Sequence, residues 1–145
     1  MFGKLKEKLT GGAARMNGKT DLLEGICAAC VMVGAADGDF SDDEAQVALD
    51  RLLNHETISV AFSTAQIEQA FDKQAKRAKS GMSGRIALTR EVEDVKKKST
   101  NEDMEMLFMI AIDVAGADGS IGDKEAAALN KIGTIIGLSL ARYLE

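Results

Sequence analysis

A ten-residue pattern occurs twice in the chain, 81 residues apart, and it constrains the fold more than any other feature. The copies are Ala-Asp-Gly-Asp-Phe-Ser-Asp-Asp-Glu-Ala at 36–45 and Ala-Asp-Gly-Ser-Ile-Gly-Asp-Lys-Glu-Ala at 117–126, with six of the ten positions identical. Gly readily adopts the positive φ that ends a helix, and acidic side chains favour the first turn of the next one. The pattern therefore predicts two related helix-junction-helix halves.

The rest of the chain also has helical periodicity. Apolar residues recur at three- and four-residue intervals, and no segment alternates long enough to predict a strand. Pro is absent and aromatic residues make up only 4% of the chain, so we expect helices around an aliphatic core. Ser41 with Glu44, Ser63 with Gln66 and Ser99 with Glu102 have the spacing of capping boxes, and Thr20 is an expected N-cap. Helices are expected at about 20–36, 41–55, 63–80, 82–95, 99–118, 123–136 and 140–144.

These patterns predict an all-α protein of about seven helices in a single compact domain with two pseudo-repeated halves. Residues 1–19 form a basic N-terminal arm, and residues 20–145 form the helical domain. The arm lacks the apolar stretch of a secretory signal, and the longest uncharged run, Gly25–Ala36, is too short to cross a bilayer. We therefore expect a cytoplasmic protein, with peripheral contact at the inner face of the membrane left open.

Charge is distributed unevenly along the chain. The net charge of -5 argues against bulk attraction to nucleic acid, so no nucleic acid partner is expected. The segment 73–98 nevertheless carries nine basic and three acidic residues. Such a segment is typical of a solvated helix face, and it could also dock on an acidic or membrane-associated partner.

The acidic residues of the two junctions are the main candidates for a binding site. Helix capping explains Asp42, Asp43, Glu44, Asp123 and Glu125. It does not explain Asp37 or Asp118, which we expect in the last turn of the preceding helix, where the helix dipole disfavours a carboxylate. A bound Ca²⁺ or Mg²⁺, which prefers oxygen ligands, would remove the conflict.

The predicted cation ligands therefore come from both junctions. Neither junction is an EF-hand, because the sixth and twelfth positions lack Gly and Glu. Residues 37–44 hold five acids and no base, whereas Lys124 interrupts the second junction, so we expect stronger binding at the first. The predicted ligands are Asp37, Asp39, Asp42 and Glu44 in the first half and Asp118, Asp123 and Glu125 in the second, with Asp43 and Asp113 as further candidates.

Other chemically capable residues are weaker candidates. Cys27 and Cys30 form a C-x-x-C that could be a thiol site, but they lie in an apolar stripe and are more typical of buried packing. His55, the only His, is expected near a helix C-terminus, where its partial charge suits the dipole. Met104, Met106 and Met109 are more typical of a core than of a binding face. No nucleophile accompanies the acids, so no catalytic residue is predicted.

The paired D-G-x-[apolar]-x-x-x-E junctions, each after an apolar helix, resemble the tellurite-resistance TerB family, as does the start Met-Phe-Gly-Lys-Leu-Lys. The resemblance covers about residues 20–144. It implies an all-helical fold, acidic sites proposed to take divalent cations, and no established catalytic activity. It also implies partners within a stress-response system, namely a TerC-like membrane protein and TerD-like calcium-binding proteins. The matching positions are Asp37, Asp42 and Glu44, then Asp118, Asp123 and Glu125.

Three functions are compatible with the sequence. The favoured one is a non-enzymatic, divalent-cation-responsive interaction module of tellurite or stress resistance. The first alternative is a purely structural helical adaptor whose acids serve only as caps. The second is a tellurite-detoxifying enzyme that depends on the thiols of Cys27 and Cys30.

Overall fold

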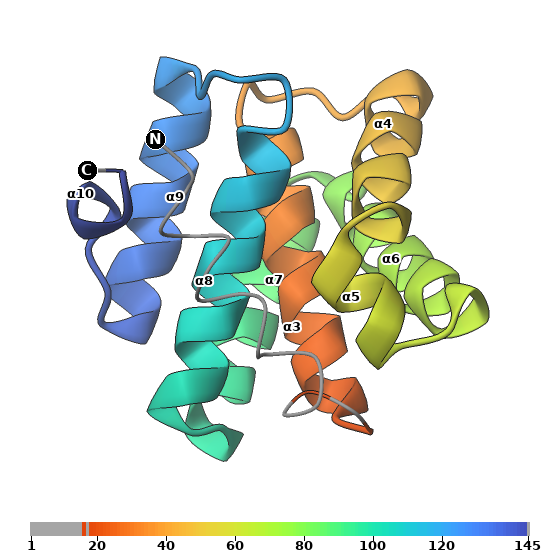
Figure 1. Cartoon of the computed structure of the whole chain (residues 1–145). Helices are drawn as coiled ribbons and strands as arrows, with labels where there is room; N and C mark the ends of the chain where they lie inside the picture. Colours follow the sequence, from red (N-terminus) through yellow and green to blue (C-terminus); the bar gives the residue numbers. More distant parts are fainter. Residues whose placement is uncertain (1–15, 17, 145) are drawn as a thin grey trace.

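The computed structural model describes Met16 and residues 18–144, and most of the predicted N-terminal arm lies outside this part of the chain. The described part is a compact all-α domain with eight helices and no strand (Figure 1), which confirms the predicted fold class. The helices are α3 (Thr20–Gly34), α4 (Asp42–Leu53), α5 (Glu56–Ala61), α6 (Thr64–Ala78), α7 (Gly81–Lys98), α8 (Asn101–Ala115), α9 (Asp123–Ile136) and α10 (Leu140–Tyr143).

Helix α3 is the centre of the domain and packs against α4, α6, α7, α8 and α9. It and α8 are apolar on most sides and are largely buried, as the sequence predicts for the segment of α8. Met104, Met106 and Met109 are all core residues. The core is mainly aliphatic, with Phe108 packing edge-on against Tyr143 at a centroid distance of 5.4 Å.

Two glycines let the central helices approach closely. A Cβ on Gly25 of α3 would lie 2.9 Å from a methyl group of Val95 on α7. A Cβ on Gly84 of α7 would lie 1.6 Å from the carbonyl oxygen of Arg77 on α6. Real Cβ atoms do not tolerate these separations, so the α3–α7 and α6–α7 contacts require glycine at both positions.

The capping boxes at Ser41 and Ser63 are present, and both start a helix as predicted. Two other predicted starts are wrong by one residue. Lys19 is the N-cap of α3 and Thr20 is already helical, while Thr100, paired with Asp103, caps α8 in place of Ser99 with Glu102. In α8 the hydroxyl of Thr100 accepts from the Asp103 amide at 3.1 Å. Ser99 and Glu102, one residue earlier, have the same capping-box spacing, which explains the error in the predicted start.

The short helix α5 was not predicted. It begins after His55, which is its N-cap. His55 also lies two residues beyond Leu53, the last residue of α4, so its predicted place near a helix C-terminus is confirmed. The backbone amide of Thr57 donates to His55 Nδ1 at 3.2 Å. Imidazole is an uncommon cap, and six residues are too few for a clear helical periodicity, so the sequence carried little signal here.

An ion pair anchors the start of the described domain. Lys19 Nζ lies 3.0 Å from a carboxylate oxygen of Asp103, whose side chain is almost fully buried. This pair joins the N-terminus of α3 to that of α8. Across the described residues, no helix combines the length and the apolar character needed to span a bilayer.

Candidate functional site

The two junctions have the same backbone turn. The amide of Gly38 donates to the carbonyl of Ala35 at 3.0 Å, and that of Gly119 donates to Gly116 at 2.9 Å. Gly38 and Gly119 have φ of +95° and +97°, the left-handed region that the repeated Asp-Gly predicts. The local turn is therefore repeated as the sequence indicates, while the pseudo-repeat of whole halves stays a prediction.

Asp37 and Asp118 lie outside the preceding helices, which corrects the argument from the helix dipole. Helix α3 ends at Gly34 and α8 at Ala115, three residues before each Asp. Asp37 Oδ1 accepts the Asp39 amide at 3.1 Å, and Asp118 Oδ1 accepts the Ser120 amide at 3.2 Å. Each Asp thus closes an Asx turn, a local role that Asp fulfils without any bound cation.

Glu44 and Glu125, which occupy the same position in the two copies, also have the same role. Glu44 Oε1 accepts the amide of Ser41, and Glu125 Oε1 accepts the amide of Gly122, both at 3.0 Å. The Glu44 amide donates to the Ser41 hydroxyl oxygen at 3.1 Å, whereas Gly122 has no side chain that could accept such a bond. The first junction therefore has one more capping interaction than the second.

A cavity of about 620 Å³ brings the two junctions together. In Figure 1 both junctions lie at the same end of the domain, at the top of the view, where α3 and α8 end and α4 and α9 begin. The cavity lies between these four helix ends, and it is called the acidic cavity below. The carboxylates that line it come from both copies of the pattern: Asp37, Asp43, Glu44, Asp123 and Glu125.

Four of the predicted ligands do not line the acidic cavity. Asp39 and Asp118 are exposed on the turns, outside the cavity wall. Asp42 pairs with Lys79 Nζ of the α6 C-cap, and this hydrogen bond lowers the pKa of the Asp42 carboxyl. Asp113 Oδ2 lies 2.6 Å from Nε2 of His55. The structure therefore brings together only part of the predicted ligand set.

Two basic side chains, those of Arg51 and Lys124, line the cavity together with the acids. Arg51 lines one wall, and its guanidinium donates to the carbonyl of Val114 at 3.1 Å near the end of α8. Lys124 lines the cavity from the first turn of α9. Sequence reasoning missed Arg51, although it follows Glu44, Val47 and Ala48 at helical spacing on one face of α4.

The acidic side chains line one space without forming a preformed metal centre. Among the residues that the structure describes, no three His, Cys, Asp or Glu side chains lie together as a metal-binding group. Their chemistry, five carboxylates at one opening, nevertheless suits a hard cation such as Ca²⁺ or Mg²⁺. Asp37, Asp43 and Asp123 are exposed, so a cation would have to draw their side chains together.

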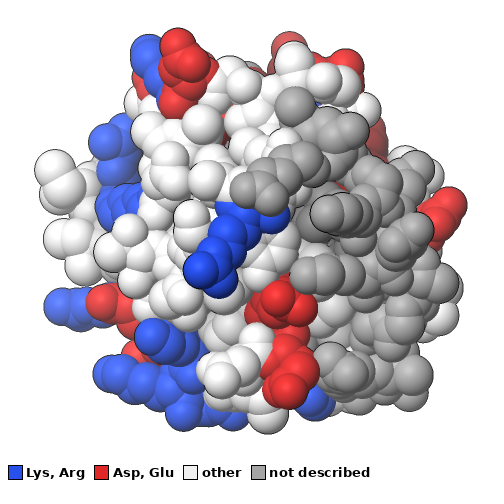
Figure 2. Space-filling view, turned by 60° about the vertical axis from the view of Figure 1, so that its left-hand side comes forward, with Lys and Arg blue, Asp and Glu red and all other residues white. Residues whose placement is uncertain are grey.

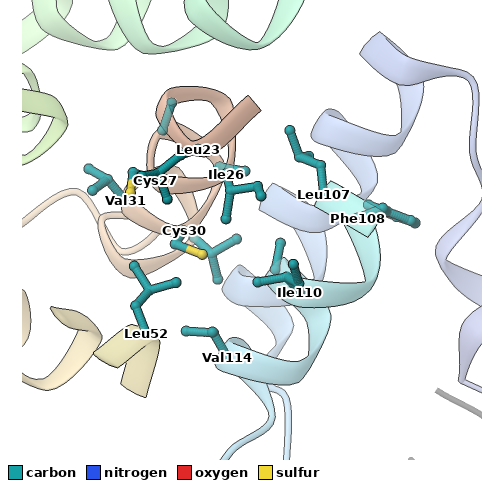
Figure 3. Close-up of a cluster of buried hydrophobic side chains, with 14 of the residues drawn as sticks. Leu23, Ile26, Cys27, Cys30, Val31, Leu52, Leu107, Phe108, Ile110 and Val114 are labelled. Carbon is teal, nitrogen blue, oxygen red and sulfur yellow. The ribbon is translucent and has the colours of Figure 1, made fainter. Parts of the chain in front are cut away.

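The thiols of Cys27 and Cys30 are buried in the core. Figure 3 shows Cys30 directed toward Ile110 and Val114 of α8, whereas Cys27 lies beside Val31. Burial raises the pKa of Cys30 to about 12 and also raises that of Cys27. Since the thiolate is the reactive form, both side chains behave as small apolar residues at neutral pH.

The basic segment 73–98 is partly neutralised within the domain. Lys73 pairs with Glu24 at 3.2 Å and Arg77 pairs with Glu91 at 2.8 Å, while Lys76 and Lys79 pair with Asp72 and Asp42. In the space-filling view of Figure 2, basic side chains lie along the left and lower left, with acidic ones among them, and further acidic side chains lie at the upper edge and the lower centre.

A comparison with protein families matches residues 23–144 to the family described as Tellurite resistance protein TerB. The chain belongs to the TerB family. Membership implies a role in tellurite resistance and confirms the resemblance drawn from the two junctions. The match begins in α3 and ends after α10, so the TerB domain contains both junctions and the acidic cavity. No curated protein and no solved structure matches the chain.

Proposed function

We propose that this TerB domain is a non-enzymatic interaction module of tellurite and stress resistance that responds to a divalent cation. The cation, Ca²⁺ or Mg²⁺, binds in the acidic cavity between the two junctions. There it adjusts the positions of α4 and α9 relative to the ends of α3 and α8. Partner proteins, a TerC-like membrane protein or TerD-like calcium-binding proteins by family resemblance, read the resulting surface.

One observation carries the proposal: carboxylates from two junctions 81 residues apart in sequence line a single cavity. Five acids and two bases face this space, a local charge of -3 if all are ionised. Like charges that line one cavity repel one another, and a divalent cation relieves the repulsion. The proposal thus differs from the sequence-based expectation, in which each junction held its own cation.

The test is calorimetric titration with Ca²⁺ and with Mg²⁺. The informative variant is Asp37→Asn with Glu125→Gln, which removes one cavity carboxylate from each junction. Asn keeps the acceptor of the Asx turn and Gln keeps that of the capping box, so the fold should persist. Losing two ligands should weaken binding by roughly tenfold or more, since about 1.4 kcal/mol corresponds to that factor.

A matched control removes the same charge outside the cavity. Asp39→Asn with Asp118→Asn also takes one carboxylate from each junction, and both residues lie off the cavity wall. This variant should bind the cation nearly as well as the unmodified chain. Equal weakening in both variants would mean a diffuse electrostatic effect, and an absence of binding heat in the unmodified chain would refute the proposal.

The structural adaptor is a second candidate, and a specific observation favours it. Asp37, Glu44, Asp118 and Glu125 each accept a backbone hydrogen bond within their own junction. An adaptor of this kind predicts that EDTA leaves the melting temperature unchanged in Ca²⁺-containing buffer. Cation binding to the folded state predicts a fall in the melting temperature on chelation.

The thiol-dependent enzyme has less support. A nucleophilic or redox role needs an accessible thiolate, and the thiols of Cys27 and Cys30 are buried with raised pKa values. A Cys30→Ala variant should therefore retain tellurite resistance in cells. Loss of resistance with an unchanged melting temperature would restore the enzymatic interpretation.

A further inference from the structure

A second cavity, of about 320 Å³, lies beside the acidic cavity on the other side of the first junction. It is bounded by the end of α3, the first junction, the end of α6, and the facing sides of α7 and α9. The two cavities are direct neighbours, because Ala36 and Lys124 line both of them. We call the second one the cationic pocket.

The charge of the cationic pocket is opposite to that of its neighbour. Its charged lining residues are Arg85 of α7 and Lys124 and Lys131 of α9, and no acidic residue lines it. Three cations thus converge on one space in a chain whose net charge is -5. Their mutual repulsion is unfavourable, and an anion between them would relieve it.

None of these three cations forms an ion pair with an acid of the described residues. The guanidinium of Arg85 donates to the carbonyl of Gly38 at 3.3 Å, which places it at the pocket without neutralising it. Lys124 is the second residue of α9, where the positive end of the helix dipole disfavours a cation. Capping and ion pairing therefore leave these positive charges unexplained.

The remaining wall of the pocket is apolar. Met32, Phe40 and Leu88 line it together with small Ala residues of α9. Phe40 and Leu88 are buried and hold the wall in place, while Met32 is only partly buried and has a flexible side chain that can adjust to a ligand. An apolar wall beside convergent polar groups is the usual composition of a small-molecule site.

We propose that the cationic pocket binds a small organic anion with a short apolar chain. Lys124, Lys131 and Arg85 hold the carboxylate or phosphate head, and the chain lies against Met32, Phe40 and Leu88. The volume is at the lower end of the range for small-molecule sites, so a short chain fits this space better than a long one. This inference does not depend on cation binding in the acidic cavity.

Four ligands test separately how the pocket recognises the anionic head and the apolar chain. Octanoate and octyl phosphate carry both an anionic head and a chain, inorganic phosphate carries only the charge, and octanol carries only the chain. Titrations followed by NMR of the Met32 and Leu88 methyl groups should show saturable binding of the first two. Phosphate and octanol should bind at least roughly tenfold more weakly, because each makes only part of the contacts.

Two variants test the location. Lys124→Ala with Lys131→Ala removes two exposed head-group cations and should weaken octanoate binding by roughly tenfold. Ala127→Leu keeps every charge and fills the pocket, so it should also weaken binding. The matched control, Lys97→Ala with Lys98→Ala, removes two exposed lysines of α7 that do not line the pocket, and it should leave the affinity unchanged.

The possible results either support or overturn the proposal. Equal affinity for inorganic phosphate would make the pocket an inorganic anion site, and equal affinity for octanol would make it merely apolar. An equal loss in the Lys97, Lys98 control would mean non-specific attraction. Octanoate that fails to shift the methyl signals at millimolar concentration would overturn the proposal outright.

Discussion

The two junctions have the same turn but different charges. Each contains an Asx turn, a glycine with φ near +96° and a glutamate that accepts the N-cap amide. Asp39, Ser41 and Asp43 of the first junction correspond to Ser120, Gly122 and Lys124 of the second. The backbone turn is therefore shared, whereas the charges of Asp39 and Asp43 and the side-chain cap of Ser41 belong to the first junction alone.

One of the differing positions, occupied by Asp43 in the first junction and Lys124 in the second, lines cavities of opposite charge. Asp43 contributes a negative charge to the acidic cavity, whereas its counterpart Lys124 faces both the acidic cavity and the cationic pocket. A substitution at this position changes what the surface attracts without removing a backbone hydrogen bond. The experiments below test whether shape and charge are as separable as the comparison indicates.

The largest expected effect concerns the shared glycines. Gly38→Ala and Gly119→Ala force an L-residue into positive φ, which costs about 1–2 kcal/mol. An added Cβ meets nothing closer than 3.8 Å at Gly38 and nothing within 4 Å at Gly119. Backbone strain is therefore the only expected cause, and the two variants should lose similar free energy of unfolding in denaturant titrations. A difference well above 1 kcal/mol would show that the turns are not equivalent.

The next effect concerns the residue before each helix. Ser41→Ala removes the side-chain cap of α4 and should cost about 1 kcal/mol. Gly122→Ser should add the missing cap to α9 and gain a few tenths of a kcal/mol, because Gly is already a tolerable N-cap. Denaturant titration of both variants measures the change. Destabilisation by Gly122→Ser would mean that Glu125 Oε1, 3.2 Å from the added Cβ, cannot move aside.

These local rules also explain how much of the molecule could be predicted from its sequence. The helices other than α5, the capping boxes at Ser41 and Ser63 and the Asp-Gly turns depend on residues close in sequence, and they were predicted, although α3 and α8 end at Gly34 and Ala115, before those turns. The roles of Asp42 and Asp113 were not predicted, because their partners Lys79 and His55 are distant in sequence. Patterns along the chain indicate which face of a helix is buried, but they do not indicate which distant residues lie next to it in the folded domain.

The acidic cavity illustrates the same limit. Its five carboxylates were all among the predicted ligands, yet the sequence could not indicate that both junctions face one space. That arrangement follows from α3 and α8 ending side by side at the same end of the domain (Figure 1). The cationic pocket was missed for the same reason, because Arg85, Lys124 and Lys131 approach one another only in the folded domain.

A smaller effect should follow from Lys124, which faces both surfaces. Lys124→Ala should strengthen Ca²⁺ binding by roughly threefold, because a unit charge near the surface contributes about 1 kcal/mol or less. The same variant should weaken octanoate binding. Paired titrations of one protein preparation measure both changes. If the affinities for Ca²⁺ and octanoate both rose or both fell, the assignment of Lys124 to two cavities of opposite charge would be contradicted.

The smallest expected effect is a change in the pKa of Asp42, the first residue of α4, relative to Asp123, the first residue of α9. Lys79 pairs with Asp42 and lowers its pKa below the ordinary value of 3.8, while Asp123 occupies the corresponding position in the second junction. A lowered folded-state pKa stabilises the fold above the unfolded pKa, and the contribution disappears as the pH falls through the folded pKa. Because Asp42 is fully exposed, solvent screens the pair, and the effect on overall stability should be slight.

Lys79→Ala should raise the pKa of Asp42 toward 3.8, as measured by NMR titration of the carboxyl carbon, with the Asp123 signal as the internal control. An unchanged Asp42 titration would mean that the Lys79 contact does not persist in solution, and Asp42 and Asp123 would then have equivalent surroundings at the two helix starts.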